Sequence, residues 1–192
     1  ACARVEPACH MNMRTQVRFV TFLAALLLET AAEEMLSSRY MFVFTEAHCA
    51  GSEVQLQEVQ LFSEGTLLSI GDVSNPGGKG GTPAAVIDSD VAQCTPTCLA
   101  YSAGSKWIDA NMANPGYSSI LELTLSAPAL VDAYEFVTAD ADPCTDPVSW
   151  SLYRWLDNCW TQLAQESGAN SPSERYTSYG VRYLYSPPPL PP

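Results

Sequence analysis

The chain has 192 residues, of which 47% are hydrophobic and 16% are charged, and its formal net charge is −12 at pH 7. This length is typical of one domain with extensions, and four Trp, nine Tyr and six Phe supply apolar material for one core. Because the acidic balance repels phosphate groups and anionic headgroups, we expect neither nucleic acid nor membrane insertion as a mode of binding.

Residues 11–32 have the pattern of a secretory signal peptide. Two arginines precede the apolar run Phe19–Leu28, and Thr30 and Ala32 are small residues at the −3 and −1 positions of a cleavage site. The run is far shorter than the roughly 20 residues of a membrane-spanning helix. A helix packed on the domain is the alternative. We therefore expect a secreted or extracellular protein, with residues 1–32 outside the folded domain.

Short β-branched and aromatic runs predict strands along the remaining chain, the first of them at Tyr40–Thr45. In Val54–Phe62 the apolar residues change face near Gln57 and Glu58, which predicts a β-bulge. Asp157-Asn158 predicts a hairpin turn between two Trp-containing strands. The other predicted strands are Ser119–Leu125, Val131–Thr138, Trp150–Arg154, Trp160–Ala164 and Tyr179–Tyr185.

No useful helical periodicity follows residue 36. Residues 33–185 are therefore predicted to form one all-β domain, an antiparallel sandwich or barrel. Residues 186–192, S-P-P-P-L-P-P, predict polyproline II or a flexible tail.

Five cysteines follow the signal-like segment, at Cys49, Cys94, Cys98, Cys144 and Cys159. Secretion favours disulfides, and an odd number leaves at least one cysteine unpaired or paired between chains. Cys94 and Cys98 are close enough to close their own loop, and Cys144 with Cys159 is a second candidate pair. Spacing alone does not determine the connectivity.

The glycine-rich segment N-P-G-G-K-G-G-T-P begins at Asn75. Its glycines permit positive φ angles and close backbone contacts, so we expect a tight loop over a sheet edge. The G-K-[ST] sequence and the following helix of a phosphate-binding loop are both missing. We expect Asp88 and Trp107 to clamp this loop internally, with Trp107 and Trp150 as core anchors.

Asp88 ends an apolar run, and we expect it to be desolvated. A buried carboxylate needs backbone N–H partners, a cation or a metal ion. Hydrogen bonding and calcium coordination are both open, and Asp90 and Asp109 are near enough in the inferred loop to complete a calcium site of oxygen ligands.

Five segments in order carry a family resemblance: R-Y-M-F-V-F-T-E-A (39–47), V-Q-L-Q-E-V-Q-L-F (54–62), N-P-G-G-K-G-G-T-P-A-A-V-I-D (75–88), K-W-I-D (106–109) and D-P-V-S-W-S-L-Y (146–153). They resemble the discoidin-like, or coagulation-factor type C, modules of the galactose-binding-like superfamily. The resemblance implies an antiparallel jelly-roll β-sandwich whose loops at one end bind glycans, phospholipid headgroups or proteins without catalysis. It also implies, in many members, a structural calcium near residues 85–107.

On this resemblance we expect a glycan-binding module. An aromatic ring stacks on a sugar, while Asn and Lys bond its hydroxyls, so the candidate ligand residues are Tyr101, Lys106, Asn111, Asn114 and Tyr117. The insertion 91–105 could reshape this rim. The His with two Arg of fucose- and galactose-binding members has no obvious match, and the loops lack the basic rim of phospholipid binders. The alternative function is a structural protein-interaction domain in an extracellular or lumenal assembly.

Catalytic arrangements are weak by comparison. His48 and Cys49 are adjacent in a strand, so their side chains point to opposite faces. A zinc site formed by these two with Cys94 and Cys98 is conceivable, although disulfides suit a secreted protein better. Three acids, Asp140, Asp142 and Asp146, fall in one turn rather than across a cleft. We therefore expect that the protein is not an enzyme.

Overall fold

The computed structural model describes residues 36–88, 106–114 and 116–184, and its strands belong to the unit that begins at Ser37. In these ranges the regular structure is antiparallel β-strand with three short 3-10 helices. The prediction of an all-β fold is confirmed. Of the helices in the described ranges, none is long and apolar enough to cross a membrane. The predicted signal segment and proline-rich tail lie outside the described residues.

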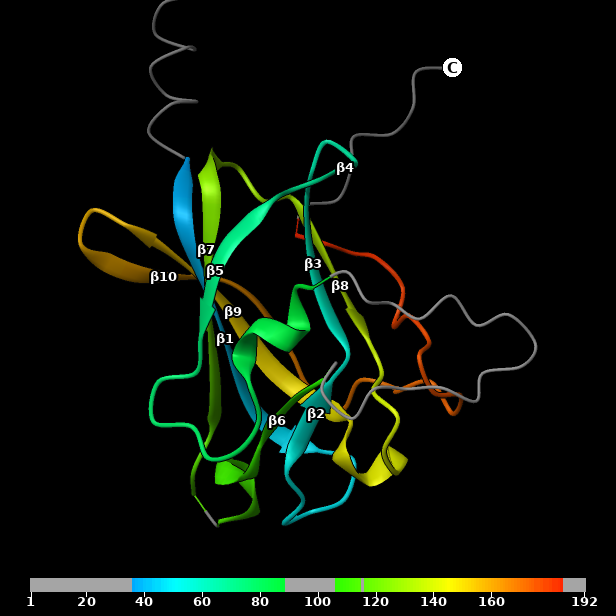
Figure 1. Cartoon of the computed structure of the whole chain (residues 1–192). Helices are drawn as coiled ribbons and strands as arrows, with labels where there is room; N and C mark the ends of the chain where they lie inside the picture. Colours follow the sequence, from blue (N-terminus) through cyan, green and yellow to red (C-terminus); the bar gives the residue numbers. More distant parts are fainter. Residues whose placement is uncertain (1–35, 89–105, 115, 185–192) are drawn as a thin grey trace, which may run out of the picture. The chain divides into compact units, whose positions relative to one another are not determined.

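The larger sheet has five strands in the order β10-β9-β1-β7-β5, with β1 (Ser37–Ala47) in the centre (Figure 1). Its other strands are β5 (Ile70–Ser74), β7 (Ser119–Ala129), β9 (Pro147–Leu156) and β10 (Cys159–Glu166). β1 pairs antiparallel with β7 on one side and with β9 on the other. Four of the predicted strands therefore belong to one sheet.

The second sheet has four strands in the order β11-β8-β3-β4. They are β3 (Glu58–Ser63), β4 (Thr66–Leu67), β8 (Ala133–Val137) and β11 (Arg182–Tyr183). A separate pair joins β2 (Val54–Leu56) to β6 (Trp107–Asp109). The strand predicted at Tyr179–Tyr185 is thus reduced to a two-residue ladder beside β8.

The predicted bulge near Gln57 is a change of partner strand. β2 pairs with β6, whereas β3 pairs with β8, and the backbone N–H of Gln57 donates to the Val137 carbonyl at 2.9 Å. Residues 54–59 are all buried. The apolar phase changes because each half buries its side chains against a different neighbour, so one bulged strand was the wrong description.

Aromatic side chains from the two larger sheets meet in the core. Tyr40, Phe42 and Phe44 alternate along β1 with no exposed surface. The Phe42 ring lies 5.3 Å from Tyr134 and 5.0 Å from Phe136 of β8, measured between centroids. The sheets therefore pack face to face as in a β-sandwich, and such aromatic pairs add stability beyond their buried area.

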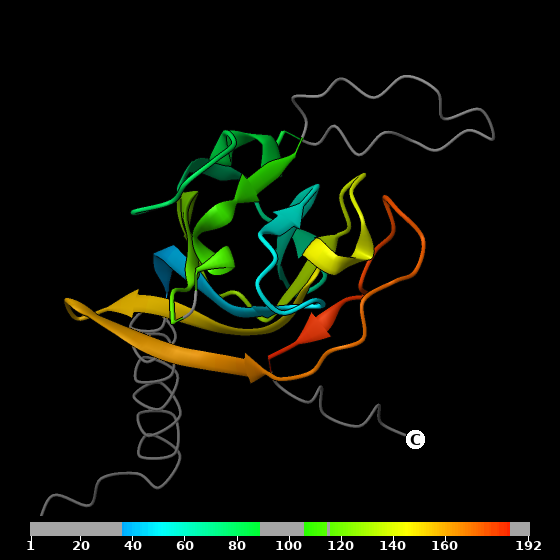
Figure 2. The ribbon, with the colours of Figure 1, turned by 90° about the horizontal axis from the view of Figure 1, so that it is seen from below.

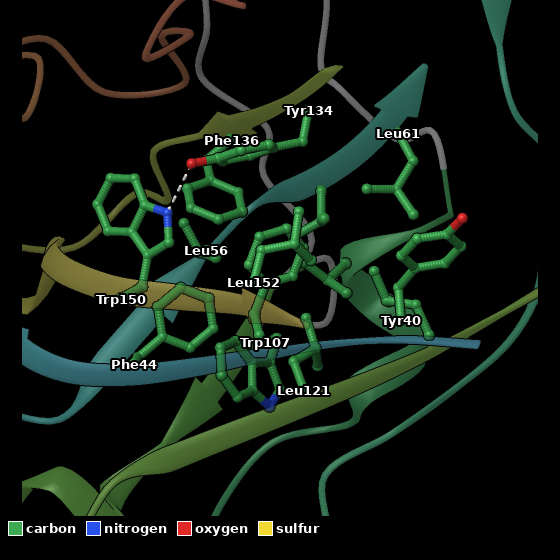
Figure 3. Close-up of a cluster of buried hydrophobic side chains, with 14 of the residues drawn as sticks. Tyr40, Phe44, Leu56, Leu61, Trp107, Leu121, Tyr134, Phe136, Trp150 and Leu152 are labelled. Carbon is green, nitrogen blue, oxygen red and sulfur yellow. Dashed lines mark hydrogen bonds between the residues drawn. The ribbon is translucent and has the colours of Figure 1, made fainter. Parts of the chain in front are cut away.

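Two tryptophans complete this core, as predicted. Trp107 is fully buried and Trp150 is 1% exposed. The indole N–H of Trp150 donates to the Tyr134 hydroxyl at 3.0 Å, the bond drawn in Figure 3. The indole nitrogen of Trp107 has no hydrogen-bond partner in the described part of the chain.

The turn predicted at Asp157-Asn158 is confirmed. Both residues have positive φ, +51° and +60°, and Leu156 pairs with Cys159 across the turn. Two successive left-handed residues form a type I′ turn, whose twist matches that of the flanking strands. β9 and β10 consequently form a long hairpin, drawn in yellow and orange in Figure 2.

In the described part of the chain, a disulfide joins Cys49 to Cys144 and spans 95 residues of sequence. Cys159 is free and exposed. The predicted Cys144–Cys159 pair is therefore wrong, because β9 separates these residues by about 30 Å of extended strand. The disulfide also removes the Cys49 thiolate from the zinc alternative and from a Cys–His dyad. Cys94 and Cys98 lie outside the described residues.

Candidate ligand-binding groove

A groove of about 530 Å³ lies at the end of the larger sheet where β1 ends and β7 and β9 begin. Two loops form its walls: the connection from β1 to β2, and the connection from the 3-10 helix η2 (Ala110–Ala113) to β7. Its polar and aromatic lining residues are Thr45, Glu46, His48, Ser52, Asn114 and Tyr117.

Two of the predicted ligand residues, Asn114 and Tyr117, meet at this groove. Both are exposed, and the Tyr117 residue retains 65% of its accessible surface. The backbone N–H of Tyr117 donates to the Asn114 carbonyl at 3.2 Å, and Gly116 has a φ of +83°. This tight turn, which needs a residue that tolerates positive φ, presents the aromatic ring at the rim.

The opposite wall carries Glu46 and His48, which the sequence did not single out as ligand residues. Register shifts on either side of Glu46 interrupt the pairing of β1 with β9, and both Thr45 and Glu46 are exposed. Irregular pairing of this kind re-aims side chains near binding sites. The Glu46 carboxylate accepts a hydrogen bond of 2.6 Å from the Ser149 hydroxyl, which fixes its position. The signal available in the sequence was that two polar residues, Glu46 and His48, follow the predicted strand Tyr40–Thr45.

Two other predicted ligand residues, Lys106 and Asn111, do not line this groove. Lys106 forms an ion pair with Asp140. Asn111 is only 9% exposed, and its side-chain amide donates to the Gly77 carbonyl at 2.6 Å. Both side chains are thereby engaged in contacts within the protein. Tyr101 lies outside the described residues.

The glycine-rich loop packs tightly against β6, as predicted. Gly80 has a φ of +128°, and a Cβ atom there would lie 3.0 Å from the Ile108 carbonyl oxygen. The Ala110 N–H donates to the Lys79 carbonyl at 2.7 Å. Only glycine combines this backbone conformation with so close an approach.

Asp109 anchors this loop in place of the expected clamp through Asp88. Asp109 is fully buried, and its Oδ1 accepts hydrogen bonds of 2.9 Å from the backbone N–H groups of Lys79 and Asn111. Asp88 is exposed, so the expectation that it is desolvated is wrong. The fully buried part of the apolar run ends in the 3-10 helix η1 (Pro83–Val86), which buries Ala85 and Val86, while Ile87 is only half-buried.

The predicted calcium ligands are only partly placed. Asp90 lies outside the described residues, and Asp88 and Asp109 differ in exposure. Oδ2 of Asp109 is buried and has no hydrogen-bond partner within the described ranges. These ranges hold no group of three or more His, Cys, Asp or Glu side chains suited to a metal ion. Calcium requires six to eight oxygen ligands, so Asp109 alone supplies a fraction of such a site.

The acids of the turn before β9 make contacts within the fold. Asp142 accepts a hydrogen bond of 2.9 Å from the Cys144 N–H at the start of the 3-10 helix η3 (Pro143–Thr145). Asp146 is 1% exposed and pairs with Arg175. Asp140 pairs with Lys106, so the carboxylates of Asp140, Asp142 and Asp146 each contact another group within the protein.

No protein-family model, curated protein or solved structure matches this chain.

Proposed function

We propose that this chain is a secreted or cell-surface binding module of the discoidin-like type, with a jelly-roll sandwich, that recognises a glycan without catalysis. The observation that carries the proposal is the exposed Tyr117 ring at the rim of a groove formed by loops at one end of a sheet. An open aromatic face stacks on the C–H surface of a sugar ring. The Cys49–Cys144 disulfide suits an oxidising compartment.

The charges around the groove favour a neutral glycan. Among the described residues that line it, none is Lys or Arg, and Glu46 contributes a carboxylate. The whole chain has a formal net charge of −12. Anionic sugars would therefore meet like charge without a cation to bind them. Asn114 and His48 offer donors and acceptors that suit hydroxyl groups.

Calcium is part of the proposal as structural support for the loops. Oδ2 of Asp109 is a buried oxygen without a hydrogen-bond partner in the described part of the chain. A calcium ion bound there would hold the glycine-rich loop through a carboxylate of β6. Thermal unfolding with added calcium and with EDTA tests this component without any sugar.

A glycan array of neutral oligosaccharides and their sialylated or sulfated counterparts tests recognition, followed by titration calorimetry on the best ligand. Tyr117→Ala should weaken binding at least tenfold. Tyr183→Ala is the matched control, because Tyr183 is also 65% exposed but lies on β11, away from the groove. Absence of binding with and without calcium, or equal loss in both variants, overturns the proposal.

A structural interaction domain is the second candidate function. The exposed cysteine at the start of β10 and the exposed Val181 and Tyr183 near β11 favour it. This function predicts stable association with a protein and no sugar binding, so the array and a size measurement distinguish the two.

A further inference from the structure

Among the described strands, β10 forms one margin of the larger sheet and pairs with β9 alone. In Figure 1 it extends with β9 to the side of the sheet. Within the described ranges, no backbone hydrogen bond reaches β10 from a loop. The second side of this strand therefore presents N–H and C=O groups that can pair with another strand.

The other margins of the two larger sheets are protected in ways that β10 is not. β4 and β11 have two residues each, and β5 has five residues with the exposed Asp72 among them. β10 has eight residues, C-W-T-Q-L-A-Q-E, with no Lys, Arg or Pro. Its single charge, Glu166, is paired with Arg182 at 3.2 Å. Edge strands that avoid association are usually short, charged, bulged or interrupted by proline, and of these features β10 has the register shift after Gln162 and the one paired charge.

The turn geometry identifies the backbone groups on the open side. Leu156 and Cys159 close a two-residue I′ turn, so their N–H and C=O groups face each other. Hydrogen-bonded and non-hydrogen-bonded pairs alternate along an antiparallel ladder. Thr161 therefore faces β9 with its backbone, and Trp160 and Gln162 direct theirs outward. A register shift follows Gln162, so Cys159–Gln162 is the regular part of the strand.

We infer that β10 pairs antiparallel with β10 of a second copy of this chain, which joins two sheets into one. With the two-fold axis at Thr161, Trp160 of one copy exchanges both backbone hydrogen bonds with Gln162 of the other. An isologous contact uses the same segment on both copies.

The charge of the chain also favours β10 as the contact surface between two copies. Two copies that each carry a formal net charge of −12 repel each other, and the regular part of β10, Cys159–Gln162, adds no charged side chain to the contact. Added salt screens this repulsion and should strengthen the dimer. Pairing through β10 would also present two grooves to a surface glycan, and linked sites raise the apparent affinity without new contacts.

Sedimentation velocity of the full chain over a concentration series tests the inference. The parent chain should dimerise, more strongly at higher salt, and Gln162→Pro should remove the dimer because it deletes an outward N–H but no bond to β9. Gln162→Lys is the second variant, in case proline prevents folding, because it places like charges near the axis. Thr124→Lys is the matched control: Thr124 is exposed on β7, an interior strand of the same sheet, and this variant should dimerise like the parent.

Cross-linking tests the register. In a Cys159→Ser background, Thr161→Cys should form an intermolecular disulfide under mild oxidation, because non-hydrogen-bonded partners lie about 4.5 Å apart between Cα atoms. A monomer at every concentration overturns the inference. A dimer that persists in both Gln162 variants also overturns it, because the contact would then not use the backbone of β10. A dimer that is lost on Cys159→Ser alone overturns it as well, because the contact would then depend on the Cys159 thiol.

Discussion

Asp146 and Arg175 form a two-point ion pair that ties the segment after β10 to the start of β9. Nη1 and Nη2 of Arg175 donate to the two carboxylate oxygens of Asp146 at 2.7 and 2.8 Å, and Nη2 also reaches the Pro172 carbonyl at 2.8 Å. This hydrogen bonding raises the pKa of Arg175, so the guanidinium stays charged. The backbone carbonyl of Asp146 accepts from the His48 N–H at 2.9 Å, which connects the pair to a wall of the groove.

Arg175→Met should lower the free energy of unfolding by about 3 kcal/mol, because it leaves the buried Asp146 carboxylate without its cation. Arg39→Met is the control, since Arg39 pairs with Glu122 at 3.4 Å on a partly exposed surface and should cost about 1 kcal/mol. Urea unfolding followed by circular dichroism measures both values. Equal losses would contradict a special contribution from the buried pair.

Asp109→Ala should destabilise the protein by about 2 kcal/mol, because the N–H groups of Lys79 and Asn111 lose their shared acceptor. Asp109→Asn keeps an oxygen in the same place and should cost less than about 1 kcal/mol. Denaturant unfolding distinguishes the two variants. If Asp109→Asn lowers the free energy of unfolding as much as Asp109→Ala does in the presence of EDTA, the two backbone hydrogen bonds do not account for the stabilising effect of Asp109.

The double variant Cys49→Ser with Cys144→Ser should lower stability by about 2–4 kcal/mol. Removing this cross-link, which spans 95 residues, restores conformational freedom to the unfolded chain. Cys159→Ser, at the exposed free cysteine, should change stability by less than about 0.5 kcal/mol. Thermal unfolding under non-reducing conditions measures both, and a large effect at Cys159 would argue against its free state.

Stability should fall at alkaline pH. Burial raises the pKa of Tyr179 well above its ordinary value, and burial also raises that of Tyr134. A group with a raised folded-state pKa binds its proton more tightly when folded. Its contribution is complete below the unfolded pKa of about 10 and is lost progressively as the pH rises above that value.

The free energy of unfolding between pH 8 and 12 measures this slope. Tyr179→Phe should flatten the alkaline decline, whereas Tyr183→Phe, at an exposed tyrosine, should leave the decline as in the parent. An unchanged slope in Tyr179→Phe would show that other groups govern alkaline unfolding.

Local patterns predicted the individual strands well because alternation and turn chemistry act within a few residues. The aromatic alternation of Tyr40–Thr45 became the centre of β1, and Asp157-Asn158 formed the turn between β9 and β10. The glycines after Asn75 packed against β6 because their lack of a Cβ is itself the property that the loop requires.

The candidate site was predicted only in part. Asn114 and Tyr117 reached the groove, but Glu46 and His48 joined them because β1 ends beside the start of β7, a contact far apart in sequence. Asp109 rather than Asp88 anchors the loop, because β6 pairs with β2 and its last residue, Asp109, is buried, whereas Asp88 follows η1 and is exposed.

By itself, then, the sequence determined an all-β chain of short strands, its tight turns and its buried tryptophans, because these depend on side-chain periodicity and backbone preference. The tertiary structure alone decided how Val54–Phe62 divides between two pairings, which cysteines join, and which loops form a groove beside Tyr117. These features depend on strand order, and strand order is set by the burial of both sheets together rather than by any local segment.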